Sequence, residues 1–143
     1  MPDWNESGDL PTGIHAASLK EVIARFGTGS VQRLQVVDRL RRIYSLALGT
    51  GQLARFIIFG SFVTDKPDPN DVDIFLLMED SFDAAQLVDE AAILFDHLAA
   101  QSYFGASIFW VRRLAALGGE AATIEHWQIK RGGDRRGIVE VLK

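Results

Sequence analysis

The sequence predicts an α/β (α+β) domain in which helices pack on a small mixed β-sheet. Two short apolar runs, Phe56–Phe59 and Val72–Met78, show no polar alternation, which is typical of strands covered on both faces. Segments before and after them carry apolar residues at helical spacing. The chain has 143 residues, the size of one domain with a sizeable core. We therefore expect residues 1–17 to form an arm or loop and residues 18–143 to form a single domain.

The composition is that of an ordinary globular protein, with 48% hydrophobic and 24% charged residues. The absence of cysteine excludes a disulfide framework and a thiolate metal site. The first residues are acidic and polar, and no apolar run reaches the roughly eighteen residues that a membrane span needs. We therefore expect a cytoplasmic protein without membrane contact. The net charge of −4 argues against broad binding to a polyanion but permits a small nucleotide held through a metal ion.

Two helices are predicted in the first third of the chain. Ser18, followed three residues later by Glu21, is typical of the cap of a short helix over residues 19–26. Ser30 precedes a longer segment, residues 31–48, whose apolar side chains recur at helical spacing. The basic side chains of this second helix fall mostly on the side away from the apolar stripe: Arg33, Arg39, Arg41 and Arg42.

The second half of the chain predicts another long helix and a further strand. Ser81 or Asp83 is the expected cap of a helix that ends near residue 99, and Ser107–Val111 has the composition of a strand.

The tail is predicted to form a C-terminal β-hairpin, with arms over residues 124–130 and 137–142. Basic side chains surround its turn, and they either contact a nucleic acid or acidic partner or are simply solvated: Lys130, Arg131, Arg135 and Arg136.

The segment Gly60–Leu77 contains the residues that indicate chemistry. Asp71 and Asp73 are two residues apart at the start of a predicted strand, so their side chains point to the same face. Two neighbouring carboxylates repel each other, and their burial is unfavourable unless a cation lies between them. Mg²⁺ suits such a pair, because it takes hard oxygen ligands and keeps coordination sites for phosphate and water. The pair is therefore the predicted metal-binding and catalytic site.

A small-residue bend precedes the aspartates. Gly60 directly follows a buried strand, where a glycine lets the backbone approach a ligand closely. Ser61 would offer its hydroxyl and nearby N–H groups to an anion, and Lys66 is either a phosphate contact or a solvated loop lysine. If the two strands are neighbours, a triphosphate would rest on this bend while a metal ion bridges it to the aspartates. Gly60, Ser61 and Lys66 are thus the predicted nucleotide-binding residues.

The spacing Gly-Ser-x9-Asp-x-Asp, residues 60–73, resembles the motif of the DNA polymerase beta-like nucleotidyltransferase superfamily in its minimal form. The flanks, Leu-Pro-x-Gly-Ile-His at residues 10–15 and Phe-Gly-Ser-Phe-Val-Thr-x-Lys-Pro at residues 59–67, are similar to an uncharacterised bacterial family of nucleotidyltransferase-like proteins. The resemblance implies a small mixed sheet with packed helices, a nucleoside triphosphate and two Mg²⁺ ions bound in part by the two aspartates.

The sequence departs from the superfamily at one position. Active members carry a third carboxylate on the strand after the following helix, and here residues 106–111 contain no acid. Without it the site would bind one metal ion and a triphosphate but would transfer poorly. Asp96 or Glu125 would replace it only if the fold brings either one close.

Other features have structural interpretations. Gly27–Ser30 lacks the Gly-Lys-Ser/Thr ending of a phosphate-binding loop and is interpreted as a turn between helices. The three histidines show no metal-ligand spacing. Trp110 and Trp127 are predicted core aromatics on strands, with base stacking as the alternative.

The motif leaves three functions to weigh. The first is a Mg²⁺-dependent nucleotidyltransferase that moves a nucleotidyl group to an unknown hydroxyl of RNA, protein or a small molecule. The second is a non-catalytic or regulatory relative, such as the antitoxin or partner half of a bacterial toxin–antitoxin or defence pair, which the missing acid favours. The third is a structural module that keeps only the fold.

Overall fold

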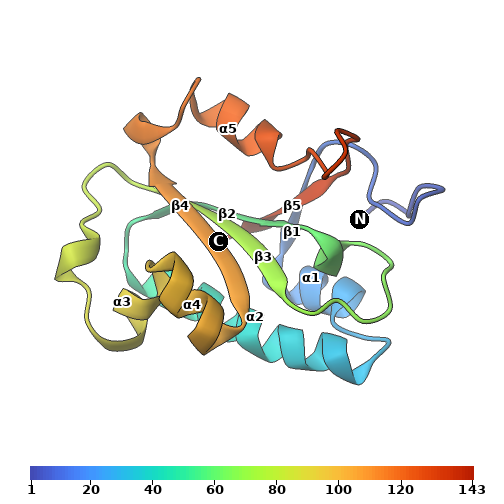
Figure 1. Cartoon of the computed structure of the whole chain (residues 1–143), viewed down its shortest axis with the longest axis horizontal. Helices are drawn as coiled ribbons and strands as arrows, with labels where there is room; N and C mark the ends of the chain where they lie inside the picture. The colour runs from blue at the N-terminus through green and yellow to red at the C-terminus, as the bar shows by residue number, and fades with distance from the viewer.

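The computed structural model describes all residues from Met1 to Lys143. At its centre is a five-stranded sheet formed by β1 (Ile14–Ser18), β2 (Leu53–Phe59), β3 (Val72–Met78), β4 (Ala106–Arg112) and β5 (Ile138–Leu142). The strand order is β1-β5-β2-β3-β4 (Figure 1). β1 is parallel to β5 and β3 is parallel to β4, whereas β2 is antiparallel to both of its neighbours. The predicted mixed sheet is therefore confirmed.

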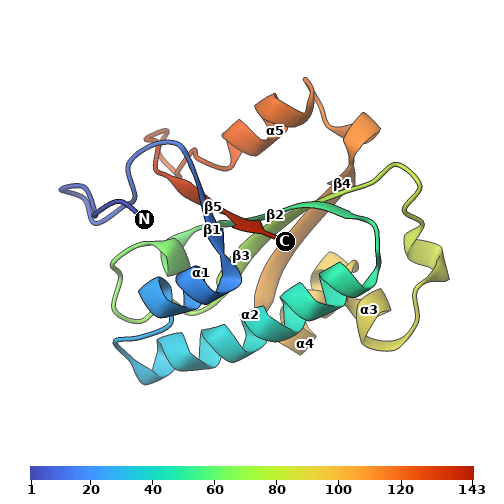
Figure 2. The ribbon, with the colours of Figure 1, turned by 180° about the vertical axis from the view of Figure 1, so that it is seen from behind.

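Five α-helices cover the sheet unequally: α1 (Leu19–Phe26), α2 (Val31–Gly49), α3 (Asp89–Leu94), α4 (His97–Phe104) and α5 (Glu120–His126). Both ribbon views place α1 to α4 on one side of the sheet and α5 on the other (Figures 1 and 2). The main core, with 28 buried residues, includes residues of α1, α2 and α4, while a second cluster of five buried residues includes one from α5. No helix combines the length and the apolar character that a membrane-spanning segment requires.

The two N-terminal helices begin where the sequence predicts. The Ser18 hydroxyl accepts a hydrogen bond from the Glu21 N–H, and the Glu21 carboxylate accepts one from the Ser18 N–H, both at 3.1 Å. This reciprocal pair is a capping box. Ser30 accepts from the Arg33 N–H at 3.1 Å and caps α2 in the same way. Side-chain hydrogen bonds at Ser18 and Ser30 thus determine where α1 and α2 begin.

The N-terminal segment is more ordered than the predicted arm. Ile14–Ser18 forms the edge strand β1 and pairs with β5 from Ile14 opposite Ile138 to Ser18 opposite Leu142. The two alanines in β1 carry little strand propensity, so the strand depends on its distant C-terminal partner. The prediction of an arm or loop is therefore wrong for residues 14–17.

The helix predicted up to residue 99 is wrong as a single element. The chain instead forms a 3-10 turn over Ala84–Gln86 and then the separate helices α3 and α4. Asp83 caps only the 3-10 turn. Asp96 starts α4 by accepting a hydrogen bond at 3.1 Å from the N–H three residues on. Asp96 therefore separates α3 from α4, whereas α3 begins at Val88 without a side-chain cap.

The predicted C-terminal hairpin is wrong in its first arm. Residues 120–126 form α5, and only an isolated bridge joins Ile129 to Arg135. Ile124 and Trp127 are three residues apart and join the same apolar cluster, which is helical spacing. The second arm is a strand, β5, but its partners are β1 and β2.

Candidate functional site

The candidate site lies where β2 ends and β3 begins. Because the two strands are antiparallel, Phe59 at the end of β2 pairs with Asp73 near the start of β3. Gly60 follows with a φ of 80°, a conformation that favours glycine. A Cβ atom at Gly60 would overlap the Asp73 carboxylate, so the Gly60 backbone and this carboxylate are in close contact. The structure thus brings the glycine bend and Asp73 together at one edge of the sheet.

Asp73 has an unfavourable electrostatic environment. Burial and, second, the negative charge of Asp71 raise the pKa of Asp73 to about 6. Arg136 and the hydroxyl of Ser107 on β4 act in the opposite direction. Asp71 and Asp73 are therefore close enough to repel each other, and a bound cation would relieve that repulsion. The donor set fits Mg²⁺, which prefers hard oxygen ligands.

The turn that follows Gly60 is anchored by buried side chains and by hydrogen bonds through Thr64. Ser61 opens a 3-10 turn, Ser61–Val63, whose other two side chains are fully buried. The Thr64 hydroxyl donates to the Ser61 carbonyl oxygen at 2.7 Å and accepts from the Lys66 N–H at 3.2 Å. The Lys66 side chain lies on the exposed loop beyond the turn. Ser61 is therefore held in a fixed turn directly after the Gly60–Asp73 contact, while a phosphate contact of Lys66 stays a prediction.

A buried arginine holds this loop against the helices. Arg33 is only 5% exposed, although the helical pattern places it away from the apolar stripe of α2. Its guanidinium donates at 2.5 to 2.8 Å to the carbonyl oxygens of Phe26, Phe62, Thr64 and Lys66. A guanidinium carries five donors in a rigid fork, which suits several carbonyl acceptors at once. Arg33 thus connects the end of α1 to both ends of the loop after Gly60.

The strand expected to carry a third carboxylate, β4, has a serine opposite Asp73. Ser107 on β4 pairs directly with Asp73 on β3. Asp96 caps α4, and Glu125 pairs with Arg135 at 2.9 Å. No group of three histidine, aspartate or glutamate side chains that could hold a metal ion is present. Neither Asp96 nor Glu125 therefore completes a three-acid site.

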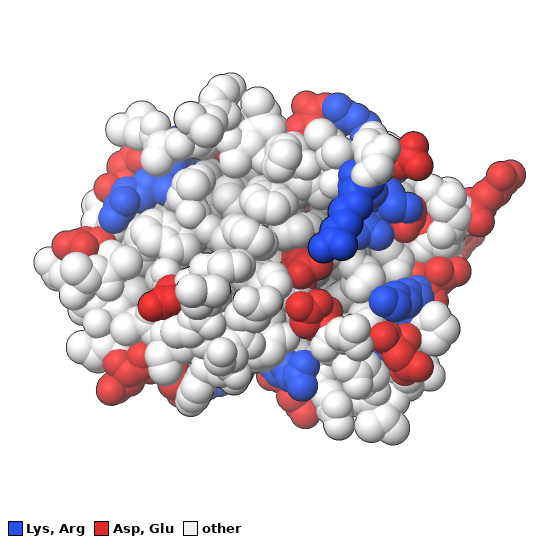
Figure 3. All heavy atoms as spheres, viewed as in Figure 1, with Lys and Arg blue, Asp and Glu red and all other residues white.

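Two basic side chains of the C-terminal loop pair with the N-terminal segment, and one of them, Arg136, also lies near Asp73. Lys130 and Arg136 both pair with Asp9, at 2.8 and 3.6 Å, and Asp9 is only 5% exposed. Arg136 also acts on the charge of Asp73. In the space-filling view, a group of basic side chains directly adjoins acidic ones at the border of a large uncharged surface (Figure 3). The N-terminal segment thus organises part of the basic cluster, a role that sequence reasoning missed because the pairing spans most of the chain.

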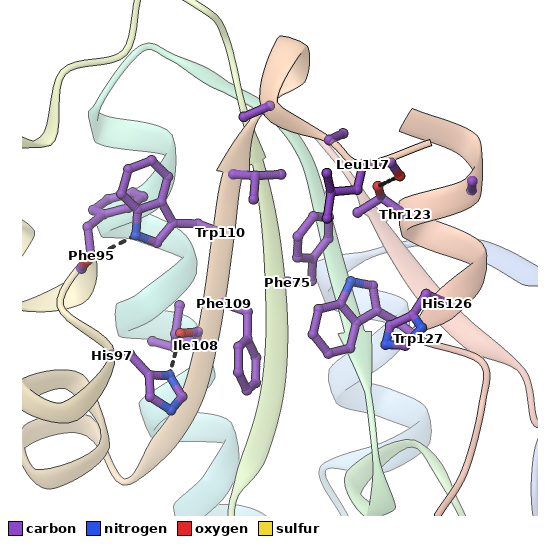
Figure 4. A pocket seen from close by; sticks show the side chains of 14 residues that line it. Phe75, Phe95, His97, Ile108, Phe109, Trp110, Leu117, Thr123, His126 and Trp127 are labelled. Atoms are coloured by element: carbon purple, nitrogen blue, oxygen red, sulfur yellow. Dashed lines mark hydrogen bonds between the residues drawn. The ribbon is translucent and has the colours of Figure 1, made fainter. Parts of the chain in front are cut away.

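An apolar groove lies on the exposed side of β4. It has a volume of about 690 Å³, and 11 of its 14 lining residues are hydrophobic. Figure 4 shows Phe75, Phe109 and Trp127 along it, with His97 at its other side. Trp127 lies just after α5 and not on the predicted strand, and Trp110 on β4 donates to the Phe95 carbonyl oxygen at 2.9 Å. Both tryptophans are half-buried, so the prediction of core aromatics holds only in part.

Substitution of Gly60 by alanine is expected to reduce the free energy of unfolding by about 2 kcal/mol or more, because its backbone conformation is almost restricted to glycine. The new Cβ would also displace the Asp73 carboxylate. Urea unfolding measures the change. Gly49→Ala is the matched control, because a Cβ at this helical position meets nothing within 4 Å. Equal stability of the two variants would contradict the close contact at Gly60.

The fold and this site define a small α/β domain with two acidic side chains and a glycine bend at the edge of its sheet. The chain belongs to a family of unknown function, DUF6932, whose family model matches residues 2–142. No curated protein and no solved structure matches the chain.

Proposed function

We propose that this chain is a Mg²⁺-dependent, nucleotidyltransferase-like protein that binds a nucleoside triphosphate at the Gly60 bend. The observation that carries the proposal is the contact of the Asp73 carboxylate with the Gly60 backbone, with Asp71 close enough to repel it. A folded protein tolerates two such carboxylates at a cost, and a divalent cation between them would offset that cost. The bend provides a place for phosphate within reach of that cation.

The reaction that such a site would perform is nucleotidyl transfer. A hydroxyl oxygen of an acceptor attacks the α-phosphorus and forms a new P–O bond. The bond from the α-phosphorus to the pyrophosphate oxygen breaks, pyrophosphate leaves, and the hydroxyl proton passes to water. Mg²⁺ bound by Asp71 and Asp73 would neutralise the developing charge, and Ser61 and Lys66 would position the phosphates. The acceptor would be a hydroxyl of RNA, protein or a small molecule.

Ser107 favours a second candidate. It stands beside Asp73 on β4, and this is the strand on which the resemblance implies a third carboxylate. A two-metal reaction needs ligands for the ion that activates the attacking hydroxyl, and a neutral serine is a poor replacement. This favours a single Mg²⁺ ion and a protein that binds nucleotide without efficient transfer. Such a relative would act through a partner protein, as in the toxin–antitoxin or defence pair considered above.

Thermal unfolding tests the binding step. Mg²⁺ and a nucleoside triphosphate together are expected to raise Tm by several degrees, because ligand at one hundred times its Kd stabilises the folded state by about 2.7 kcal/mol. Triphosphate with a chelator should give a much smaller shift. If none of the four common triphosphates with Mg²⁺ moves Tm, the proposal fails. Release of pyrophosphate with an added acceptor would distinguish the transferase from the non-catalytic relative.

A further inference from the structure

The Gly60 bend has the aspartates on one side and a basic side chain on the other. In the sheet, β2 lies between β3, which carries the aspartates, and β5. β2 and β5 are antiparallel and pair Ile58 with Val139. Three residues beyond Ile58 is Ser61, and three residues before Val139 is Arg136, so antiparallel pairing directs both to one edge of the sheet. Both ribbon views show the turn after β2 and the turn before β5 at the same end of the sheet (Figures 1 and 2).

The backbone that carries the Arg136 side chain is fixed. The Arg136 N–H donates to the Gln128 carbonyl oxygen at 2.8 Å. The next N–H, of Gly137, donates to the Leu10 carbonyl oxygen at 2.9 Å. A Cβ atom at Gly137 would overlap the Pro11 carbonyl oxygen, so the N-terminal segment packs directly against this turn. An ordered backbone of this kind lowers the entropic cost of ligand binding by the side chain that it presents.

The guanidinium of Arg136 has free donors. Its ion-pair partner is Asp9, whose Oδ1 lies 3.6 Å away, beyond hydrogen-bond distance. Asp9 instead accepts a hydrogen bond from Lys130 at 2.8 Å, so one buried carboxylate faces two cations. The Arg136 side chain is only 23% exposed, and its guanidinium carries five N–H groups. A partly buried cation with unused donors suits an anionic ligand, above all one that accepts two parallel hydrogen bonds.

We propose that Arg136 binds the phosphate that rests on the Gly60 bend, from the side opposite the aspartates. This inference rests on the proposed function, because the same phosphate would contact the Mg²⁺ ion held by Asp71 and Asp73. A phosphate group has several charged oxygens, so it can meet a metal ion on one side and a guanidinium on the other. Arg136 thus supplies a fixed positive charge at a site whose two aspartates suit a single Mg²⁺ ion.

Titration calorimetry with two probes tests this inference: Mg²⁺ alone, and inorganic tripolyphosphate at a constant excess of Mg²⁺. Arg136→Gln should weaken tripolyphosphate about 10- to 100-fold, because it removes hydrogen bonds from a charged donor. It should not weaken the binding of Mg²⁺ alone, because the guanidinium contacts the phosphate and not the metal ion. Arg136→Lys keeps the charge without the planar fork, and we expect its affinity for tripolyphosphate to be intermediate.

Arg135→Gln is the matched control for the loss of one positive charge. The Arg135 side chain is exposed and pairs with Glu125 at 2.9 Å. Because exposed charges are screened by salt, this variant should change neither affinity by more than about twofold. If it weakens tripolyphosphate as much as Arg136→Gln does, only the general charge of the loop matters and the inference is overturned.

The remaining outcomes separate this inference from the proposed function. If Arg136→Gln binds tripolyphosphate as tightly as wild type, the inference is overturned while the phosphate site stands. Equal losses for Mg²⁺ alone and for tripolyphosphate would overturn it too, since Arg136 would then act through the aspartates. If wild type binds no tripolyphosphate although a nucleoside triphosphate raises its Tm, this inference fails alone, and if neither binds, both proposals fail. If Arg136→Gln does not fold, Arg136→Lys decides: a loss for tripolyphosphate alone supports the inference, and wild-type affinity overturns it.

Discussion

Asp73→Asn is expected to abolish the stabilisation by Mg²⁺ and nucleoside triphosphate while making the ligand-free protein more stable. Burial and the nearby Asp71 disfavour the ionised carboxylate, as the raised pKa of Asp73 shows. An uncharged amide of nearly the same shape removes that repulsion. Because Asp73 is partly exposed, we expect a gain of about 1–2 kcal/mol at pH 7.5, less than the full pKa shift would give. Urea unfolding and ligand titration measure the two effects.

The pH dependence of stability gives an independent test of the unfavourable charge on Asp73. The pKa of Asp73 is about 6 in the folded state, above its ordinary value of 3.8. Between these two values the folded state binds more protons than the unfolded state. Stability therefore falls as pH rises through this window, and the penalty is complete above pH 6. In Asp73→Asn this part of the pH dependence should disappear, and Mg²⁺ affinity of the wild type should fall as pH drops below 6.

Asp38→Asn is the matched control, because Asp38 is exposed on α2 and outside the candidate site. It should change the free energy of unfolding by no more than about 0.5 kcal/mol, and it should leave the response to Mg²⁺ unchanged. The proposal would be contradicted if Asp73→Asn lost stability like a core substitution, or if it kept the full thermal response to Mg²⁺ and triphosphate. The first result would make Asp73 a structural hydrogen-bonding residue, and the second would remove it from the metal site.

The features that the sequence predicts correctly are those with local causes. Ser18 and Ser30 cap helices through bonds to residues three positions on, so their pattern is visible in a short window. Gly60 and Asp73 meet because two apolar strands separated by a short loop pair in an antiparallel way. The sequence predicts that these two residues meet if the two strands are neighbours, and the observed antiparallel pairing meets that condition.

The features that sequence reasoning misses depend on distant partners. β1 is a strand only because β5, at the other end of the chain, supplies its hydrogen bonds. Arg33 occupies a polar position of the helical pattern, but its acceptors lie in a loop that the pattern does not describe. Trp127 was expected on a strand. It follows the short helix α5, and its aromatic partners are on β2 and β3. Contacts between residues far apart in the sequence therefore determine these features, and apolar periodicity alone does not predict them.

Arg33→Met is expected to cause the largest loss of stability, about 3–5 kcal/mol in the free energy of unfolding. The substitution keeps an apolar stem of similar length but leaves four backbone carbonyl groups without their donor. Carbonyl groups that stay buried without a partner are costly, and the hydrogen bonds lost here come from a charged group. Arg33→Lys offers three donors from a single nitrogen in place of the fork, and we expect it to be intermediate.

The position of Arg33 ties this stability to the candidate site, because its acceptors include the carbonyl oxygens of Thr64 and Lys66 on the loop after Gly60. In Arg33→Lys, measured at a temperature where it remains folded, Mg²⁺–triphosphate affinity should fall although the aspartates are unchanged. Arg41→Met, on the exposed side of α2, is the control and should stay within about 0.5 kcal/mol of wild type. Equal stability of Arg33→Met and Arg41→Met would show that the loop holds its shape without the guanidinium. Unchanged ligand affinity in a destabilised Arg33→Lys would restrict Arg33 to folding, because the phosphate-binding bend would then keep its geometry without it.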